Sequence, residues 1–398
     1  MLILVINCGS SSAKYQLFNA KKQTILANGV VERIGQSTAA LKHNDNGSAT
    51  VTRKVVCADH HVAINIIVDI LCDKKYGAIA SKDEIYGIGH RVVHGGEKFK
   101  ESTLITDEVV KYINKYSELA PLHNPPSLLG IRACSEILKD VPQVAVFDTS
   151  FHQTMPQVAF MYGLPYKYYK QYGIRKYGFH GTSHRYVSAE AARILRKPLN
   201  KLKLITCHLG NGCSMAAVDR GISVDTTMGF TPLEGLPMGT RSGDLDPAVI
   251  LFMIEKENIS LNRVNDILNK ESGFLGISGV SNDVRDIVNA IDHGTSGASE
   301  RSKLTLDMFI YRIKKYIGAY YAAMGGLDAI VFTAGISENN PWLVKRIEKD
   351  MKRLFPRKVR FMVVPTNEEL LIAKDTYEII GKKNRQDVKG LKYSSLTF

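Results

Sequence analysis

The stretch LILVINCGSSSAKYQLF, residues 2–18, determines the fold at the start of the chain. Leu2 to Ile6 form a continuous apolar run, which is typical of a strand buried on both faces. The turn-forming cluster from Asn7 to Ser12 ends this run, and a second strand follows from Lys14 to Phe18. The stretch therefore predicts a β-hairpin with a Gly/Ser tip.

A similar stretch, LKLITCHLGNGCSMAAV, occupies residues 202–218, about half the chain further on. When the two stretches are aligned with an offset of 201 residues, Asn7 falls opposite His208 and Gly9 opposite Gly210. Hairpins that contain glycine are common, so a single pair is also compatible with chance. We expect a duplicated domain in which each half begins with such a hairpin.

Strand and helix patterns alternate through the rest of the chain. Val144 to Phe147 form a short apolar strand, and residues 148–151 mark a domain boundary. Ser183 has the properties of an N-cap for the helical pattern that follows it. A long helical pattern over residues 304–324 stops at two glycines, and a strand follows over 328–332. This alternation predicts an α/β fold with two similar domains.

The composition is that of a globular enzyme with anionic partners. The 398 residues are 44% hydrophobic and 23% charged, and the net charge is +13. A basic excess favours anions but does not choose among nucleic acid, membranes and phosphorylated metabolites. The densest basic run, residues 345–360, holds eight Lys and Arg side chains. We expect a solvated face there, because no aromatic ladder interleaves the charges.

The targeting and redox signals point to a cytoplasmic protein. The six cysteines are scattered without a C-x-x-C pair, so neither a zinc site nor a disulfide framework is indicated. The N-terminal apolar run lacks a basic region before it and is too short for a signal peptide. No run of about 18 apolar residues occurs, so we expect no membrane span.

Three glycine-containing turns follow apolar strands and could bind phosphate through backbone N–H groups. They are Asn7–Ser12, His208–Gly212 and Gly335–Asn339. None matches the P-loop or the dinucleotide-binding fingerprint. Each turn alone could be an ordinary tight turn, but the three together favour a nucleotide ligand.

Arginine and histidine also lie between glycines in GHRVVHGG (residues 89–96), GFHG (178–181) and MGTRSGD (238–244). A guanidinium group binds carboxylate or phosphate through two parallel hydrogen bonds. Pairing with a nearby surface acid is the alternative for any one arginine. Positions in glycine-rich loops favour a small anionic ligand.

Candidate metal ligands are Asp148, at the end of a strand, and the Glu368–Glu369 pair, which also suits a solvated helix start capped by Thr366 or Asn367. Magnesium needs only one or two carboxylates when phosphates and water complete its shell. A nuclease would need several carboxylates, including one on the first strand, where this chain has Asn7.

With these motifs the chain resembles the acetate kinase family. The matching segments include NCGSSSAKYQLF, GHRVVHGG, APLHNPPSL, VFDTSFHQTMP, YGIRKYGFHGTSHRYV, CHLGNGCS, FTPLEGLPMGTRSGDLDP, SGFLGISGVSNDVRDI, VFTAGISEN and PTNEEL, in the family's order. The resemblance implies two ribonuclease H-like domains of the actin-like ATPase type with an active-site cleft between them. It divides the chain into residues 1–150 plus about 370–398, and residues 151–369, with nucleotide binding and the dimer interface in the second part.

The resemblance also implies an activity: reversible, in-line transfer of the γ-phosphoryl group of ATP to acetate, giving acetyl phosphate and ADP, with Mg²⁺ or Mn²⁺, in a cytoplasmic homodimer. Propionate or another short-chain carboxylate is the alternative acceptor. An ATP-gated clamp and a nucleic-acid-binding protein are rival classes. The first lacks a segment for an added partner-binding element, and the second lacks the carboxylate cluster.

The resemblance assigns roles to individual residues. Catalysis would fall to Arg91, Asp148, His180 and Arg241, and acetate would contact Arg91, Val93, Leu122, His123, Phe179 and Pro232. The ATP site would use Lys14, His208, Leu209, Gly210, Asn211, Gly212, Asp283, Val284, Arg285, Gly335, Ile336, Ser337, Glu338 and Asn339. Asn7 and Glu368 would bind magnesium. Ser337, Pro237 and Pro126 depart from the family's usual Gly, Met and Ala, and Ser337 raises the question of nucleotide preference.

Overall fold

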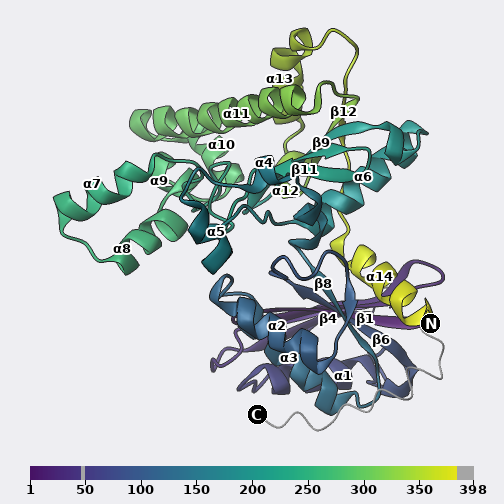
Figure 1. Ribbon diagram of the computed structural model, residues 1–398. Helices are drawn as coiled ribbons and strands as arrows, with labels where there is room; N and C mark the ends of the chain where they lie inside the picture. The colour runs from purple at the N-terminus through teal and green to yellow at the C-terminus, as the bar shows by residue number, and fades with distance from the viewer. Residues whose placement is uncertain (46–49, 383–398) are drawn as a thin grey trace. The chain divides into compact units, whose positions relative to one another are not determined.

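The computed structural model describes residues 1–45 and 50–382 (Figure 1). The chain forms two compact units: unit 1, residues 1–150 with 367–398, and unit 2, residues 151–366. The last part of the predicted first domain, residues 383–398, lies outside the described residues.

Unit 1 is built on a sheet that has eight strands in the described residues, in the order β5-β4-β3-β2-β1-β6-β8-β7. The strands are β1 Leu2–Gly9, β2 Ser12–Asn19, β3 Thr24–Glu32, β4 Ala40–Asn44, β5 Val51–Lys54, β6 Ile85–Val92, β7 Thr103–Leu104 and β8 Gln143–Phe147. The α-helices are α1 His60–Leu71, α2 Asp107–Lys115, α3 Asn124–Ile137 and α14 Glu368–Lys382. The predicted hairpin is confirmed, with Asn7 paired to Lys14.

The alternation of side chains along β1 explains why both faces of this sheet are covered. Leu4 and Ile6 pack in one core cluster with residues of α1 and α3. Ile3 and Val5 point to the opposite face and pack in a second cluster with α14. Figure 1 shows α14, in yellow, on the other side of the sheet from α1 and α3.

Unit 2 repeats the central part of this topology. Its sheet, in the described residues, has the order β11-β10-β9-β12-β13. The strands are β9 Lys203–Leu209, β10 Cys213–Asp219, β11 Ile222–Thr226, β12 Ala329–Thr333 and β13 Arg360–Val363. The α-helices are α4 Gln157–Phe160, α5 Tyr166–Tyr172, α6 Gly181–Leu195, α7 Pro247–Glu257, α8 Leu261–Asp266, α9 Gly273–Ser278, α10 Val284–His293, α11 Ser296–Met324, α12 Gly335–Asn339 and α13 Pro341–Met351. The two units also contain shorter helical turns: Lys82–Glu84 and Tyr116–Glu118 in unit 1, Ser150–Thr154 at the boundary, and Leu199–Lys201, Ile267–Glu271 and Lys352–Leu354 in unit 2.

The duplication predicted from the two hairpins is confirmed by strand pairing. In each unit, an antiparallel meander is followed by two parallel neighbours: β1 pairs with β6 and β6 with β8, while β9 pairs with β12 and β12 with β13. The α/β class predicted from the sequence is therefore correct, and each unit has the order expected of the ribonuclease H-like fold.

One local prediction is wrong. Ser183 is not the N-cap of its helix, because α6 begins at Gly181 and its N-cap is His180 in a left-handed conformation (φ 56°). The Ser183 hydroxyl instead lies between Thr366 and His208, at 2.9 and 2.8 Å. Tertiary hydrogen bonds have replaced the local cap.

None of the helices within residues 1–45 and 50–382 combines the length and apolarity needed to span a bilayer.

Candidate active site

Unit 1 places Arg91 and Asp148 at the ends of two neighbouring parallel strands. Arg91 lies on β6, and Asp148 directly follows β8. The Arg91 guanidinium donates from Nε to Oδ1 of Asp148 at 3.2 Å and from Nη2 to Oδ2 at 2.7 Å. The Asp148 side chain is only 2% exposed. Two parallel charge-assisted hydrogen bonds fix the guanidinium plane, and the Asp148 carboxylate raises the pKa of Arg91 above its ordinary value.

Glu368 reaches the same corner from the N-terminus of α14. The Asn367 side chain caps this helix by accepting from Leu370 N–H at 2.9 Å. The helix lies close to β6 because Gly89 has no side chain: a Cβ there would lie 2.5 Å from Thr376 Oγ1. Glu368 Oε2 is 4.0 Å from Arg91 Nε. Burial, assisted by the neighbouring carboxylates and opposed by Arg91, raises the pKa of Glu368 to about 7.

These residues have the chemistry of a magnesium site. Glu368 offers carboxylate oxygens. Asn7 lies on β1, the neighbour of the strand β6 that carries Arg91, and offers an amide oxygen. Both are the hard oxygen donors that magnesium prefers. The raised pKa of Glu368 comes mainly from burial, which disfavours the charged carboxylate, and a bound cation would favour the charged form. Within the described residues no group of three His, Cys, Asp or Glu side chains forms a metal site, so protein carboxylates alone would not complete the shell.

Unit 2 brings His180, Arg241 and Gly212 together. Arg241 Nη1 donates to the Pro232 carbonyl at 3.1 Å. A Cβ added to Gly212 would lie 3.4 Å from His180 Nε2 and 3.6 Å from Arg241 Nη1. Partial burial lowers the pKa of Arg241, because the charged guanidinium has lost part of its hydration. The bare backbone at Gly212 therefore lies against an incompletely solvated arginine and a histidine.

The hydroxyl of Ser214, which was not predicted from the sequence, lies between two histidines, His180 and His184. Ser214 Oγ lies 2.9 Å from Nδ1 of His180 and 2.8 Å from Nε2 of His184. The His180 and His208 rings stack with centroids 4.2 Å apart. Burial lowers the pKa of His184, so this ring stays neutral and its two nitrogens act as one donor and one acceptor. The spacing of His180 and His184 by four residues was the only sequence signal for this contact.

A separate cavity of about 430 Å³ in unit 2 collects most of the predicted ATP residues. Its lining residues are Gly210, Asn211, Asn282, Asp283, Val284, Arg285, Gly335, Ile336, Asn339 and Asn340. Asn282 and Asn340 were not predicted. Asp283 caps α10 and also pairs with the side chain of Arg285, at 2.6 Å. The cavity is bounded by the glycines of two of the three predicted turns.

Other predicted ATP residues lie outside this lining. Ser337 is fully buried and does not line the cavity, and its hydroxyl donates to the carbonyl of Thr333, the last residue of β12, at 2.6 Å. Glu338 accepts from Ala334 N–H at 2.7 Å. His208 and Leu209 are buried within β9. Lys14 belongs to unit 1, where it lines a different cavity with Asn7.

The predicted acetate-pocket residues are divided between the units. In unit 1, Val93 is buried and Leu122 is 68% exposed. In unit 2, Phe179 is buried and Pro232 is half-buried. His123, the N-cap of α3, accepts through its carbonyl from Ser127 Oγ at 3.0 Å.

A phosphotransferase needs positively charged and hydrogen-bonding groups to bind phosphoryl oxygens. Arg241 and His180, which lie beside the backbone of Gly212, are groups of this kind. Comparison with known proteins is specific about the family. Residues 2–355 match the model of the acetokinase family, and the chain belongs to this family. It is a kinase.

Relatives and solved structures agree. An acetate kinase from Halothermothrix orenii is 53% identical over 400 residues, covering 96% of this chain and 100% of the relative. The crystal structure of the acetate kinase from Porphyromonas gingivalis is 45% identical, with a TM-score of 0.90, over 95% of this chain and 99% of that one. The crystal structure of a propionate kinase from Francisella tularensis is 39% identical, with a TM-score of 0.87, over 95% of this chain and 99% of that one.

Proposed function

We propose that this protein is an acetate kinase that transfers the γ-phosphoryl group of ATP to acetate, reversibly, giving acetyl phosphate and ADP. The observation that carries the proposal is the near-complete match to acetate kinases, at 53% identity over 96% of the chain. The anion-binding groups described above supply the chemistry.

In the proposed reaction an acetate oxygen forms a bond to the γ-phosphorus while the bond to the β–γ bridging oxygen breaks. The electron pair of the broken bond leaves with ADP. Acetate is already ionised at neutral pH, so no general base is required. Arg91 binds the acetate carboxylate, and Asp148 keeps the Arg91 guanidinium in one orientation through the two hydrogen bonds at 3.2 and 2.7 Å.

Arg241 and His180 act on the phosphoryl group in flight, whose equatorial oxygens carry the charge. The partial burial of Arg241 strengthens its electrostatic effect, since less water screens the charge. Ser214 holds the His180 ring through Nδ1, which leaves Nε2 on the side where Gly212 lies. His123, Val93, Leu122, Phe179 and Pro232 would surround the acetate.

ATP would bind in the cavity lined by Gly210, Asp283 and Gly335, with its phosphates along the exposed backbone N–H groups. Glu368 and Asn7 would hold magnesium, with Lys14 nearby. When bound, magnesium would neutralise charge on the β- and γ-phosphates. Manganese has the same preference for oxygen ligands.

Propionate is the second candidate acceptor, because a propionate kinase is 39% identical over 95% of the chain. One methylene group in an apolar pocket changes transition-state binding by about 1–3 kcal/mol. The discriminating experiment is to measure kcat/KM of the purified protein for acetate, propionate and butyrate, trapping the acyl phosphate as hydroxamate. The acetate assignment predicts the highest value for acetate, and a higher value for propionate would replace it. ATP hydrolysis that ignored all three acids would overturn carboxylate kinase activity itself.

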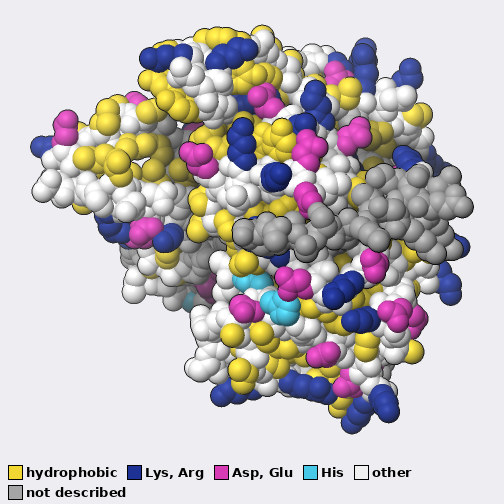
Figure 2. Space-filling view, turned by 60° about the horizontal axis from the view of Figure 1, so that its bottom comes forward, with side chains coloured by type: hydrophobic (Ala, Val, Ile, Leu, Met, Phe, Trp, Pro, Cys, Tyr) yellow, Lys and Arg dark blue, Asp and Glu magenta, His cyan; other side chains and the backbone are white. Residues whose placement is uncertain are grey.

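We further propose a homodimer formed through unit 2. Helix α7 is mostly apolar, yet none of its residues is buried. Leu251 is 65% exposed and Phe252 is 59% exposed. Figure 2 shows apolar side chains gathered at the protruding left end, where Figure 1 places α7 and α8. Apolar surface of this kind is typical of an interface. Light scattering should give a dimer mass for the protein and a monomer mass for Phe252→Asp. A wild-type monomer would exclude the dimer.

We propose a cytoplasmic location, which the free thiols of all six cysteines support.

The eight basic side chains of residues 345–360 are all exposed, as expected of a solvated face. On the face seen in Figure 2, Lys and Arg side chains are interspersed with acidic ones. The net charge of +13 therefore does not by itself indicate a nucleic-acid groove.

A further inference from the structure

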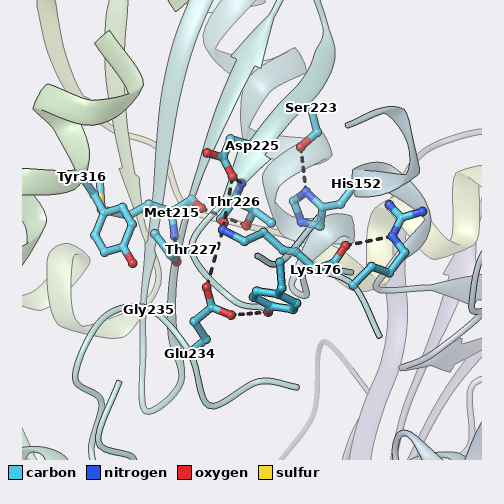
Figure 3. A network of polar contacts seen from close by, with 12 residues as sticks. His152, Lys176, Met215, Ser223, Asp225, Thr226, Thr227, Glu234, Gly235 and Tyr316 are labelled. Atoms are coloured by element: carbon cyan, nitrogen blue, oxygen red, sulfur yellow. Dashed lines mark hydrogen bonds and ion pairs between the residues drawn. The ribbon is translucent and has the colours of Figure 1, made fainter. Parts of the chain in front are cut away.

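The segment between β11 and α7, residues 227–246, carries both Arg241 and Pro232 without any regular secondary structure. We call it the Arg241 loop. A guanidinium group on such a loop has no helix or strand to fix it, yet a displacement of about 1 Å can reduce a reaction rate about 100-fold. A network of polar side chains holds this loop (Figure 3).

The first part of the network holds Glu234. The Tyr162 hydroxyl donates to Glu234 Oε2, and the same hydroxyl accepts from Phe230 N–H at 2.9 Å. Lys176 Nζ lies 3.7 Å from Glu234 Oε1. The Glu234 carboxylate folds over Gly229, where a Cβ would lie 2.2 Å from the Tyr162 hydroxyl. Figure 3 shows Lys176 between the carboxylates of Glu234 and Asp225.

Lys176 is in turn fixed to the sheet. Its ammonium group donates to the Thr226 carbonyl at 3.0 Å and lies 3.4 Å from Asp225 Oδ1. Both partners lie on β11, and the Lys176 side chain is only 15% exposed. Glu234 is therefore tied through Lys176 to a rigid strand, and through Tyr162 to the backbone of its own loop.

The second part of the network closes the loop around Asp244. Gly235 N–H donates to Asp244 Oδ1 at 2.8 Å, and Asp244 N–H donates to the Gly235 carbonyl at 2.9 Å. The Tyr316 hydroxyl of α11 donates to Asp244 Oδ2 at 2.5 Å. Burial and the adjacent carboxylates raise the pKa of both Tyr162 and Tyr316, so the phenols remain hydrogen-bond donors at neutral pH.

Arg241 lies between these two anchors. Its guanidinium donates to the carbonyl of Pro232, two residues before Glu234, and its carbonyl accepts from Met238 N–H at 3.0 Å. Asp244 follows three residues later. We propose that Glu234 and Asp244 are positioning residues, which set the place of Arg241 and of Pro232 through the loop without touching the substrate. The effect expected on turnover rests on the proposed function, whereas the effect on the place of Arg241 does not.

The first test reads the position of Arg241 without any reaction. Phenylglyoxal modifies accessible arginine, and peptide mass spectrometry gives the rate at Arg241 alone. The rate should rise several-fold in Glu234→Ala and in Tyr316→Phe, and Glu234→Gln should lie closer to the wild type because it keeps the shape and a polar contact with Tyr162. The matched control is Asp350→Asn, whose carboxylate pairs with Lys314 of α11 at 2.7 Å and is 33% exposed, as Glu234 is. Unchanged rates at Arg241 in the first two variants would refute the positioning role.

The second test is a double-mutant cycle on turnover with acetate. Glu234→Ala should lower kcat/KM about 10- to 100-fold in the wild-type background and by a several-fold smaller factor in an Arg241→Ala background, because only the effect through Pro232 is left. Equal losses in both backgrounds would show a general structural role. ADP affinity, measured by calorimetry, should stay within about twofold, since the Arg241 loop does not line that cavity. A wild-type protein inactive on acetate would reject the proposed function and leave the phenylglyoxal result to decide the positioning role.

Discussion

Replacing Glu368 with glutamine should make the metal-free protein clearly more stable at pH 8 and change its stability little at pH 5. Burial raises the pKa of Glu368 from its ordinary 4.5 to about 7. Since its folded-state pKa is higher, the folded state binds a proton that the unfolded state has released between these two values. Stability therefore falls as pH rises through this window, and the whole penalty is present above pH 7. A shift of this size corresponds to about 3 kcal/mol.

Urea denaturation of the EDTA-treated wild type and Glu368→Gln variant at pH 5, 6, 7 and 8 measures this term. The difference in free energy of unfolding between the two proteins should grow from about 1 kcal/mol or less at pH 5 to about 3 kcal/mol at pH 8. Other titrating groups cancel because both proteins contain them. Glu108→Gln, on an exposed carboxylate of the same unit that pairs with Lys98, is the control and should show no such growth.

A difference that stays constant from pH 5 to pH 8 would refute the reasoning, because it would place the Glu368 titration outside this range. Magnesium provides a second reading of the same group. Added Mg²⁺ should stabilise the wild type at pH 8 and have little effect on the variant, since the amide has no charge to offer the ion. Equal stabilisation of both proteins would remove Glu368 from the proposed magnesium shell.

Three further substitutions test other parts of the site. Gly212→Ala should lower kcat about tenfold in the hydroxamate assay with the melting temperature unchanged, because the new methyl group would lie 3.3 Å from His180 Cε1; undiminished turnover would show that His180 can yield. Asp148→Asn should cost about 3 kcal/mol in urea denaturation and most of the turnover, since Arg91 loses its buried counter-charge; a fully stable, active variant would contradict this. Ala334→Gly should raise the free energy of unfolding by about 1 kcal/mol, because Ala334 has φ 68° and ψ 169°, a region open mainly to glycine; a loss of stability would count against strain there.

The sequence predicted those parts of the fold that depend on local patterns. Apolar runs broken by glycine-rich turns were enough to place β1, β2, β9 and β10, and the match of the two hairpins revealed the duplication. The N-cap assignment of Ser183 failed because its hydroxyl found partners far away in the chain, His208 and Thr366. Propensity rules describe a residue and its neighbours, and such contacts override them.

The same limit applies to the site. Glycine-flanked arginines and histidines marked Arg91, His180 and Arg241 as anion-binding candidates, and the family resemblance supplied their roles. Their supports could not be predicted, because Arg91 and Asp148 are 57 residues apart in sequence, and Tyr316 and Asp244 are 72 apart. No periodicity connects residues at such distances. Only the strand order and the placement of α11 bring these partners together.

The duplicated fold explains why the two units carry different groups at equivalent places. Asn7 and His208 lie near the carboxyl ends of β1 and β9, and Arg91 and Thr333 lie near the ends of the parallel strands β6 and β12 that pair with them. In both units, therefore, the polar groups lie at the carboxyl ends of parallel strands, where α/β sheets bind ligands. At these positions unit 1 has the amide of Asn7 and the Arg91–Asp148 pair, whereas unit 2 has the imidazole of His208 and the hydroxyl of Thr333. Because the two units share one topology, substitutions at a few strand ends would be sufficient to give the proposed division between metal binding in unit 1 and phosphoryl binding in unit 2.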